Sequence, residues 1–389
     1  MSLVSITPQS RTAGTPAAVA SVWFAPGQRT RPPRSCRVDL IVIGARGRVG
    51  SALLRQLGRQ QGQLREDARL ELTLIAAFDR HGFAFDLQGL APDRLEHSFV
   101  PRRNDDAERL LEHVTRPGAP RTLVIDCTAS DEIADAYARL LAAGVGVVGA
   151  NKRANSRCLA SYRRLQRTAR EHGAPYRYET TVGAAIPLLG PLRDLRLRGE
   201  SVRCIEGVLS GSLSYILHRL HEGCAFSAAV AEACALGYTE PDPLEDLRAT
   251  DLVRKLLVLA REAGFPLELE DLHIEPLIEC EQTGQRSLPD RLAAHDTAWR
   301  ERIAAAIARG ERLVVVAEAT ADGGRIGLRA VPAQSPFGQL QPGQNLVLIR
   351  TDLQDQTPLT VSGPGAGAEI TAAGVLSDVL AAAAQLAGR

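Results

Sequence analysis

Short apolar runs alternate with amphipathic segments in the first half of the chain, and this pattern predicts a doubly wound α/β fold. Apolar, β-branched runs with the length of buried strands occupy residues 38–44, 70–78, 121–127 and 145–149. Helical patterns begin at Ser51 and Asp131. Strands that alternate with helices in this way form a Rossmann-like parallel sheet with right-handed crossovers. Ligands of such sheets bind beyond the carboxyl ends of the strands.

The pattern after residue 176 predicts a second domain of the α+β class. Its candidate strands, which would form an antiparallel or mixed sheet, are residues 202–209, 312–318, 325–332 and 346–350. Its candidate helices are residues 227–235, 246–263 and 295–309. An apolar helix after Thr371 is expected to return to the first domain. We therefore expect one domain of residues 38–175 with 363–389, and a second of residues 176–362. Residues 1–37, which lack acidic side chains, are interpreted as a flexible leader.

The turn after the first predicted strand is rich in glycine and predicts a dinucleotide site. Glycines allow the backbone to approach a pyrophosphate, and the following helix offers free amides at its N-terminus. The spacing is GxxGxxG, one residue longer than the usual GxGxxG. The candidate residues of this turn are Gly44, Arg46, Gly47, Val49 and Gly50.

Two neighbouring residues at the end of the second predicted strand bear on the choice of cofactor. Asp79 is in the place of an acid that binds a ribose 2′-hydroxyl, as in NAD sites. Arg80 and Arg46 would instead hold the 2′-phosphate of NADP, although Arg80 could equally be a solvated loop charge. The choice between NAD and NADP stays open, with NADP favoured by a small margin.

Lysine is almost absent from this chain, and this sets apart the two positions that carry it. Of the 46 basic side chains, 44 are arginines and only Lys152 and Lys255 are lysines. A lysine can lose its proton in a protein, whereas an arginine cannot, so acid/base chemistry is the first hypothesis for both. The alternative is that a coding bias toward arginine left two lysines by chance.

Charge and cysteine content favour a small-molecule partner and a reducing compartment. The net charge of +1 gives no electrostatic reason to bind nucleic acid or an anionic membrane. We also expect that no apolar run approaches the ~20 residues of a membrane span. The seven cysteines form no CxxC pair, which argues against a disulfide framework or a zinc site. We expect reduced thiols and a cytoplasmic location.

Several long motifs occur in register along the chain. They read CTAS (127–130), ANKRA (150–154), YETTVGAAIP (178–187), GVLSGSLSYI (207–216), LGYTEPDP (236–243) and GPGAGAEITAAG (363–374). Over residues 38–389 this order resembles homoserine dehydrogenase, and most of all the dehydrogenase half of bifunctional aspartokinase/homoserine dehydrogenases. The 37 residues before this region are too few for an aspartokinase domain. The leader is interpreted as what remains of a fusion linker.

The resemblance implies reversible NAD(P)-dependent interconversion of L-homoserine and L-aspartate 4-semialdehyde, in threonine, isoleucine and methionine biosynthesis. It implies that Lys255 is the general acid and base, with Lys152 beside the nicotinamide and substrate. Glu240, Asp246 and Asp251 would bind the substrate. Asp251 and Lys255 are four residues apart in a helical pattern, so they share one face; an ordinary surface ion pair is the alternative. Cofactor contacts are also implied for Thr128, Ser130 and Gly367, as well as for Lys152.

The resemblance further implies a bound monovalent cation, normally sodium, and a homodimer formed by the second domain. The cation ligands would be backbone carbonyls of Glu179, Val182, Ala184 and Ile186. The alternative is that residues 178–187 are only a tight crossover between domains. Residues 207–216 are either a close-packed strand-to-helix corner or part of the substrate cleft.

The chain departs from the family pattern at three places, and two rival functions are possible. The glycine loop has one extra residue, Ala249 stands where many relatives have glycine, and Val253 replaces a common alanine. One rival is another semialdehyde or amino-acid dehydrogenase with the same glycine loop, although no cysteine lies in a nucleophile motif. The other is a silent dinucleotide-binding subunit, against which the presence of both lysines argues.

Overall fold

The computed structural model describes residues 36–67, 70–101, 109, 112, 114–116, 121–239, 242–278 and 287–388. The described residues belong to one compact unit within residues 36–389. The predicted leader therefore lies outside the described residues except for its last two positions. Because the contacts group residues 36–389 together, the predicted division into two domains stays a prediction.

Seven strands form sheet A, in the order β4-β3-β2-β1-β5-β6-β7. They are β1 (Cys36–Ile43), β2 (Leu70–Phe78), β3 (Gly82–Phe85), β4 (Val100–Pro101), β5 (Thr122–Asp126), β6 (Gly146–Gly149) and β7 (Tyr176–Arg177). The five neighbouring strands β2, β1, β5, β6 and β7 pair in parallel, which confirms the predicted α/β class. Three strands of sheet A were not predicted: β7, and also β3 and β4, which extend the sheet in antiparallel fashion.

The strand order of sheet A reverses at β1, and this point positions the glycine turn. β1 pairs with β2 on one side and with β5 on the other. Ligands of open α/β sheets bind at such a reversal, beyond the carboxyl ends of the strands. Gly44 follows β1 and Thr128 follows β5 at this edge, as the motifs require.

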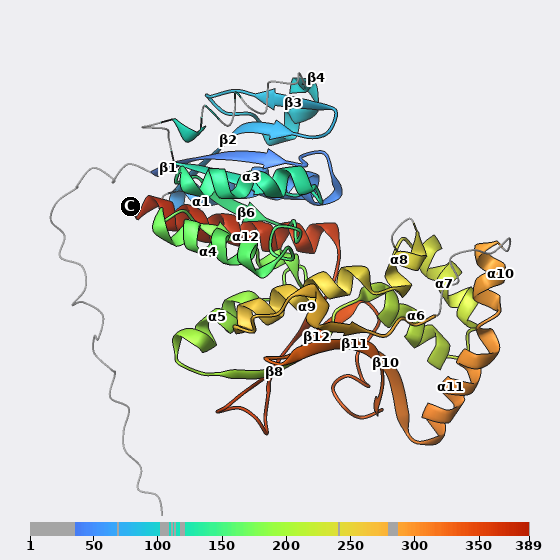
Figure 1. Cartoon of the computed structure of the whole chain (residues 1–389). Coiled ribbons are helices and arrows are strands. Elements are labelled where there is room, and N and C mark those ends of the chain that lie inside the picture. Colours follow the sequence, from blue (N-terminus) through green and yellow to red (C-terminus); the bar gives the residue numbers. More distant parts are fainter. Residues whose placement is uncertain are drawn as a thin grey trace, which may run out of the picture. The chain divides into compact units, whose positions relative to one another are not determined.

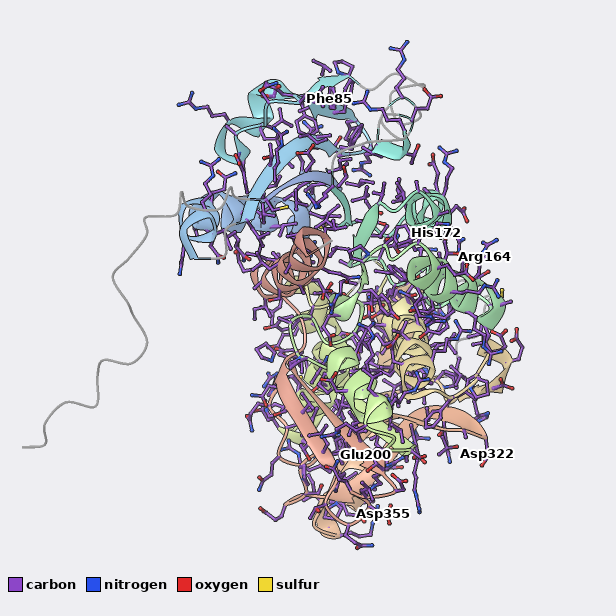
Figure 2. The ribbon with its side chains drawn as sticks, turned by 90° about the vertical axis from the view of Figure 1, so that its left-hand side faces the viewer. Phe85, Arg164, His172, Glu200, Asp322 and Asp355 are labelled. Carbon is purple, nitrogen blue, oxygen red and sulfur yellow. The ribbon has the colours of Figure 1, made fainter. Side chains whose placement is uncertain are left out.

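Helices cover both faces of sheet A (Figure 1). One hydrophobic cluster joins the sheet to α1 (Arg48–Asp67) and α12 (Ala368–Ala387). Another joins it to α3 (Asp131–Ala142) and α4 (Leu159–Glu171). The outer face of α4 is polar; its exposed Arg164, and the exposed His172 that follows its last residue, lie on the surface of the molecule in Figure 2.

Helix α12 corrects the expectation that no apolar run reaches the length of a membrane span. By length and composition it could cross a membrane, but 50% of its most apolar window is buried in the fold. Its buried residues, among them Val375 and Val379, pack with sheet A and α1. The apolar character of α12 is thus that of a core helix, as predicted for the segment that returns to the first sheet.

Six strands form sheet B, in the order β13-β12-β8-β10-β11-β9. They are β8 (Val202–Val208), β9 (Leu272–Ile274), β10 (Glu311–Thr320), β11 (Gly323–Pro332), β12 (Gln344–Thr351) and β13 (Leu359–Pro364). Only β11 and β9 pair in parallel, so the sheet is mixed, in agreement with the prediction. The helices of this part are α5 (Leu189–Leu197), α6 (Gly211–His221), α7 (Phe226–Ala235), α8 (Pro243–Leu247), α9 (Thr250–Ala263), α10 (Leu288–Ala293) and α11 (Asp296–Ala308). Short 3₁₀ turns are η1 (Pro92–Ser98), η2 (Glu179–Thr181) and η3 (Leu269–Asp271).

The predicted helix 246–263 is wrong in its first turn. The chain forms α8 and then α9, and Ala249 between them has a left-handed backbone, with φ 58° and ψ 25°. A left-handed residue cannot continue a right-handed helix, so the segment breaks there. Asp246 consequently lies on α8, while Asp251 and Lys255 lie on α9.

Candidate active site

Both lysines of the chain converge on one carboxylate. The Nζ atom of Lys152 lies 2.8 Å from Oδ1 of Asp251, and the Nζ atom of Lys255 lies 2.9 Å from Oδ2. Lys152 comes from the turn after β6, and the other two residues come from successive turns of α9. Lys255 also donates a hydrogen bond to the carbonyl of Leu209, 2.8 Å away, just after β8. The cluster therefore joins residues that are far apart in the sequence.

The two ammonium groups control the charge of Asp251. Burial alone would raise the pKa of this carboxyl, but the charges of Lys255 and Lys152 and their hydrogen bonds outweigh burial and hold the pKa well below its ordinary value. The Asp251 side chain is 46% exposed, whereas that of Lys255 is 14% exposed. An accessible carboxylate that binds two proton donors can accept a cationic group of a ligand. It also keeps the lysines next to any carbonyl oxygen bound there.

A buried carboxylate holds together the loops that follow β5 and β6. The side chain of Asp126 is fully buried and accepts hydrogen bonds from the amide of Thr128, the hydroxyl of Tyr137 and the side-chain amide of Asn151. The same Asn151 amide also donates to the carbonyl of Ser130. Asp126 thus orders the candidate cofactor residues and the turn of Lys152 at once. The sequence analysis did not single it out.

A cavity of about 1180 Å³ lies at the predicted dinucleotide site. Seven of the predicted cofactor residues line it: Gly44, Arg46, Gly47, Asp79, Arg80, Thr128 and Ser130. Four others do not: Val49, Gly50, Lys152 and Gly367. Gly50 supports the turn itself, because a Cβ atom at this position would lie 2.2 Å from the carbonyl oxygen of Gly44. These residues fit a dinucleotide, since glycine backbone and cationic side chains surround a space of suitable size.

Helix α3 forms a wall of this cavity that the sequence analysis missed. Ile133, Ala136 and Leu140 contribute its apolar surface, and Arg139 adds a charge. Positions 133, 136 and 140 share one helical face, so the apolar period was visible. A helix face that lines a cavity and a helix face that packs against the core have the same apolar spacing. The sequence alone therefore could not distinguish them.

Asp79 and Arg46 are paired at the edge of the cavity. Arg46 donates two hydrogen bonds to the carboxylate of Asp79 and lies over the ring of Phe99, 4.2 Å from its centre. The amides of His81 and Gly82 donate to the same carboxylate at 2.8 and 2.9 Å. Burial opposes ionisation of Asp79, but these donors prevail and lower its pKa to about 2. Arg80 donates a hydrogen bond to the ring of His81, whereas Arg46 is the cationic side chain that pairs with Asp79.

Three more predicted site residues remain: Asp246 and Glu240, predicted to bind the substrate, and Gly367, predicted to contact the cofactor. Asp246 accepts a hydrogen bond from the hydroxyl of Ser212 on α6, at 2.6 Å, and this places residues 207–216 beside the α8–α9 segment. Glu240 lies outside the described residues. Gly367 precedes α12 with a φ of 129°, a backbone conformation that favours glycine.

The predicted cation segment makes a strained and buried turn. Ala184 has a left-handed backbone, with φ 55°, and Val182, Ala184 and Ile186 are buried. Among the described residues, no backbone or side-chain donor is hydrogen-bonded to the carbonyls of these three. The hydroxyl of Thr180 is likewise buried without a partner. Buried carbonyls seldom lack a partner, so their oxygens fit a hard cation.

The carboxylate of Glu179 caps the N-terminus of α5. Its oxygens accept hydrogen bonds from the amides of Leu188, Leu189 and Gly190, at the start of α5. A carboxylate here satisfies the free amides at the helix N-terminus and interacts favourably with the helix dipole. The carbonyl of Glu179 accepts a hydrogen bond from the amide of Val182, at 3.4 Å.

Two family models match this chain. Residues 187–380 match the model described as homoserine dehydrogenase, and residues 46–179 match the homoserine dehydrogenase NAD-binding domain. The chain belongs to the homoserine dehydrogenase family. This membership covers both sheets, and the two lysines lie one in each matched region.

Relatives of known sequence and structure agree with this membership. A bifunctional aspartokinase/homoserine dehydrogenase of Zea mays is 36% identical over 353 residues, which are 89% of this chain and 38% of the relative. The chain thus spans well under half of such relatives. An archaeal homoserine dehydrogenase solved in complex with NADPH is 25% identical, with a TM-score of 0.69 over 89% of this chain and 97% of that chain. A Candida auris protein described as of unknown function is 29% identical, with a TM-score of 0.80 over 90% and 99%.

Proposed function

We propose that this chain catalyses the reversible NAD(P)-dependent interconversion of L-homoserine and L-aspartate 4-semialdehyde, and so serves the synthesis of threonine, isoleucine and methionine. The Lys152–Asp251–Lys255 cluster is the observation that carries the proposal. Family membership supports it as well. The proposal concerns the dehydrogenase reaction alone, because the chain spans 38% of the length of its maize relative.

The roles of the residues follow from their chemistry. The nicotinamide, when bound, supplies or accepts the hydride. Lys255 gives a proton to the aldehyde oxygen as the aldehyde is reduced, and takes it back in the reverse direction. Lys152 polarises the same carbonyl, and Asp251, with Asp246 and Glu240, binds the substrate ammonium. Charge-assisted hydrogen bonds suit both tasks, since they are the stronger ones in a partly desolvated site.

The direct test is the initial rate of nicotinamide reduction by the purified chain with L-homoserine, run in parallel with NAD⁺ and NADP⁺. We expect activity that depends on L-homoserine. A folded protein that binds either cofactor but shows no turnover would overturn the proposal and favour the silent-subunit alternative. Serine, which lacks one methylene of the substrate, is the matched substrate control.

We also propose that NADP⁺ is preferred over NAD⁺. Asp79 is already engaged by Arg46 and two amides, and Arg80 adds positive charge beside it. A 2′-phosphate would find several donors there. Arg46→Ala should therefore lower the kcat/KM ratio of NADP⁺ to NAD⁺ by about tenfold, the scale of one charged hydrogen bond. Arg48→Ala, at an exposed arginine outside the cavity lining, should leave the ratio unchanged.

A bound monovalent cation is proposed at the carbonyls of Glu179, Val182, Ala184 and Ile186. The carbonyls of Val182, Ala184 and Ile186 support it, because these residues are buried and no described donor is hydrogen-bonded to the three carbonyls. A ligand that binds only the folded chain raises the unfolding temperature as its concentration rises. We expect a higher midpoint in sodium chloride than in choline chloride at equal ionic strength. Identical midpoints over the whole concentration series would refute the cation.

A homodimer in the cytoplasm completes the proposal. The helices of this part gather on one face of sheet B (Figure 1). Its other face carries a half-exposed ladder in which Arg329 bonds Glu206 and Glu318 across three strands. This face supports self-association, and light scattering at micromolar concentration should give twice the chain mass. A monomer would contradict it.

A further inference from the structure

Helix α9 touches the loop of Lys152 at two separate places. We define this loop as residues 150–158, between β6 and α4. The first contact is the ion pair of Lys152 with Asp251. The second is made by Arg261, ten residues further along the same helix. At ~1.5 Å per residue the two contacts lie about 15 Å apart along the helix axis.

Three of the four hydrogen-bond partners of Arg261 are backbone carbonyls. Its side chain is 0% exposed, and its guanidinium donates to the carbonyls of Asn155, at 2.8 Å, and Arg157, both in the 150–158 loop. It also donates to the carbonyl of Leu267, at 3.1 Å, and to Glu268, at 2.8 Å. A planar guanidinium presents several donors in a fixed fork, which a lysine cannot reproduce. These contacts fix the loop relative to the end of α9.

The partners of Arg261 extend this attachment to both ends of the loop. Asn155 and Ser156 each donate an amide hydrogen bond to the carbonyl of Lys152, so the turn held by Arg261 is the turn that carries the lysine. The carboxylate of Glu268 accepts the amide of Leu159, at 2.8 Å, where α4 begins. The loop is therefore attached to α9 and to the segment that follows α9.

We infer that Arg261 is a positioning residue that sets where Lys152 stands relative to Asp251 and Lys255. The inference rests on the proposed function for its effect on turnover. Arg261 touches neither lysine; it acts through the backbone of the 150–158 loop. Without it, the Lys152–Asp251 ion pair still joins the loop to α9. Asp126 holds Asn151, and Arg153 and Arg157 bond α3, so these contacts hold the loop to sheet A and α3. Loss of the fork should let the loop move away from α9.

The test exploits the scarcity of lysine. Because Lys152 and Lys255 are the only lysines, an amine-reactive acetyl ester followed by peptide mass spectrometry reports each of them separately. In Arg261→Met the labelling of Lys152 should rise several-fold relative to that of Lys255, which stays on the same helix as Asp251. Turnover with L-homoserine should fall by about 10- to 100-fold, the scale of a small misplacement of a reacting group. The KM for the cofactor should change little.

Arg193→Met is the matched control. Arg193 also pairs with a buried carboxylate of α9, Glu262, at 2.8 Å, but no contact joins it to the 150–158 loop in the described part of the chain. This variant should lower stability without changing the labelling ratio. Arg261→Lys, which keeps the charge but not the fork, should give an intermediate ratio and serves if Arg261→Met does not fold.

Two outcomes would overturn the inference. One is a folded Arg261→Met or Arg261→Lys protein with the labelling ratio and turnover of the parent. The other is an equal rise in the ratio for Arg193→Met, which would mean general loosening. If the parent itself lacks homoserine turnover, the proposed function fails, but the labelling ratio still decides the role of Arg261.

Discussion

Helix α12 packs against residues 178–187, the segment of the proposed cation site. At this contact we expect a glycine-to-alanine substitution to destabilise the fold, although alanine favours a helix more than glycine does. Gly374 lies in the interior of α12 and is buried. A Cβ atom there would lie 2.6 Å from the Cγ2 atom of Thr180 and 3.1 Å from the carbonyl oxygen of Ala184. The closer of these distances is well inside van der Waals contact, so the helix or the segment would have to shift.

The expected size follows from two opposing terms. Alanine in place of glycine stabilises a helix interior by about 0.5–1 kcal/mol. Forcing an extra methyl into a packed site costs about 1–3 kcal/mol. Taking the central value of each term, Gly374→Ala should lower the free energy of unfolding by about 1 kcal/mol. Gly62→Ala is the matched control, because Gly62 lies inside α1 with no atom within 4 Å of an added Cβ. It should raise the free energy of unfolding by about 0.5–1 kcal/mol.

Urea unfolding followed by far-ultraviolet circular dichroism compares both variants with the parent. The midpoint should fall for Gly374→Ala and rise for Gly62→Ala. A midpoint for Gly374→Ala equal to or above that of the parent would show that the segment yields without cost. The reasoning from close packing would then be wrong. The sodium dependence of the midpoint should also weaken in Gly374→Ala, since the same contact touches the carbonyl of Ala184.

Two further predictions concern proton transfer and pH. Lys255→Arg should keep the fold and cofactor affinity but lose roughly 100-fold or more in kcat, since arginine cannot give up a proton; near-normal kcat would remove Lys255 from proton transfer. His221 accepts a hydrogen bond from the amide of Leu313, and burial, with the charges of Arg312 and His218, lowers its pKa from 6.5 to about 4. The unfolded chain then binds more protons between these values, so stability should fall as the pH drops from 6.5 to 4. His221→Gln should flatten this slope in urea midpoints measured at several pH values, and an unchanged slope would contradict the assignment.

Local pattern was enough to predict β1, β2, β5 and β6 of sheet A and the glycine turn. The run 70–78 was predicted with the bounds that β2 has, and the candidate turn follows β1 directly. A buried strand and a glycine turn are both specified by neighbouring residues, since burial on both faces demands a continuous apolar run. The same holds for the helical spacing of Asp251 and Lys255, which does place both on α9.

Tertiary structure decided how these parts meet. Lys152 and Asp251 are 99 positions apart, and no local signal announces that their side chains touch. The break at Ala249 was also hidden, because alanine by itself favours continuing a helix and only packing imposes the left-handed backbone. Arg261 looked like any of the 44 arginines until its four backbone and carboxylate partners came together around it. The spacing of apolar residues along the chain shows which face of each helix or strand is buried. Which polar side chains from distant segments come into contact is decided by the free energy of the whole fold.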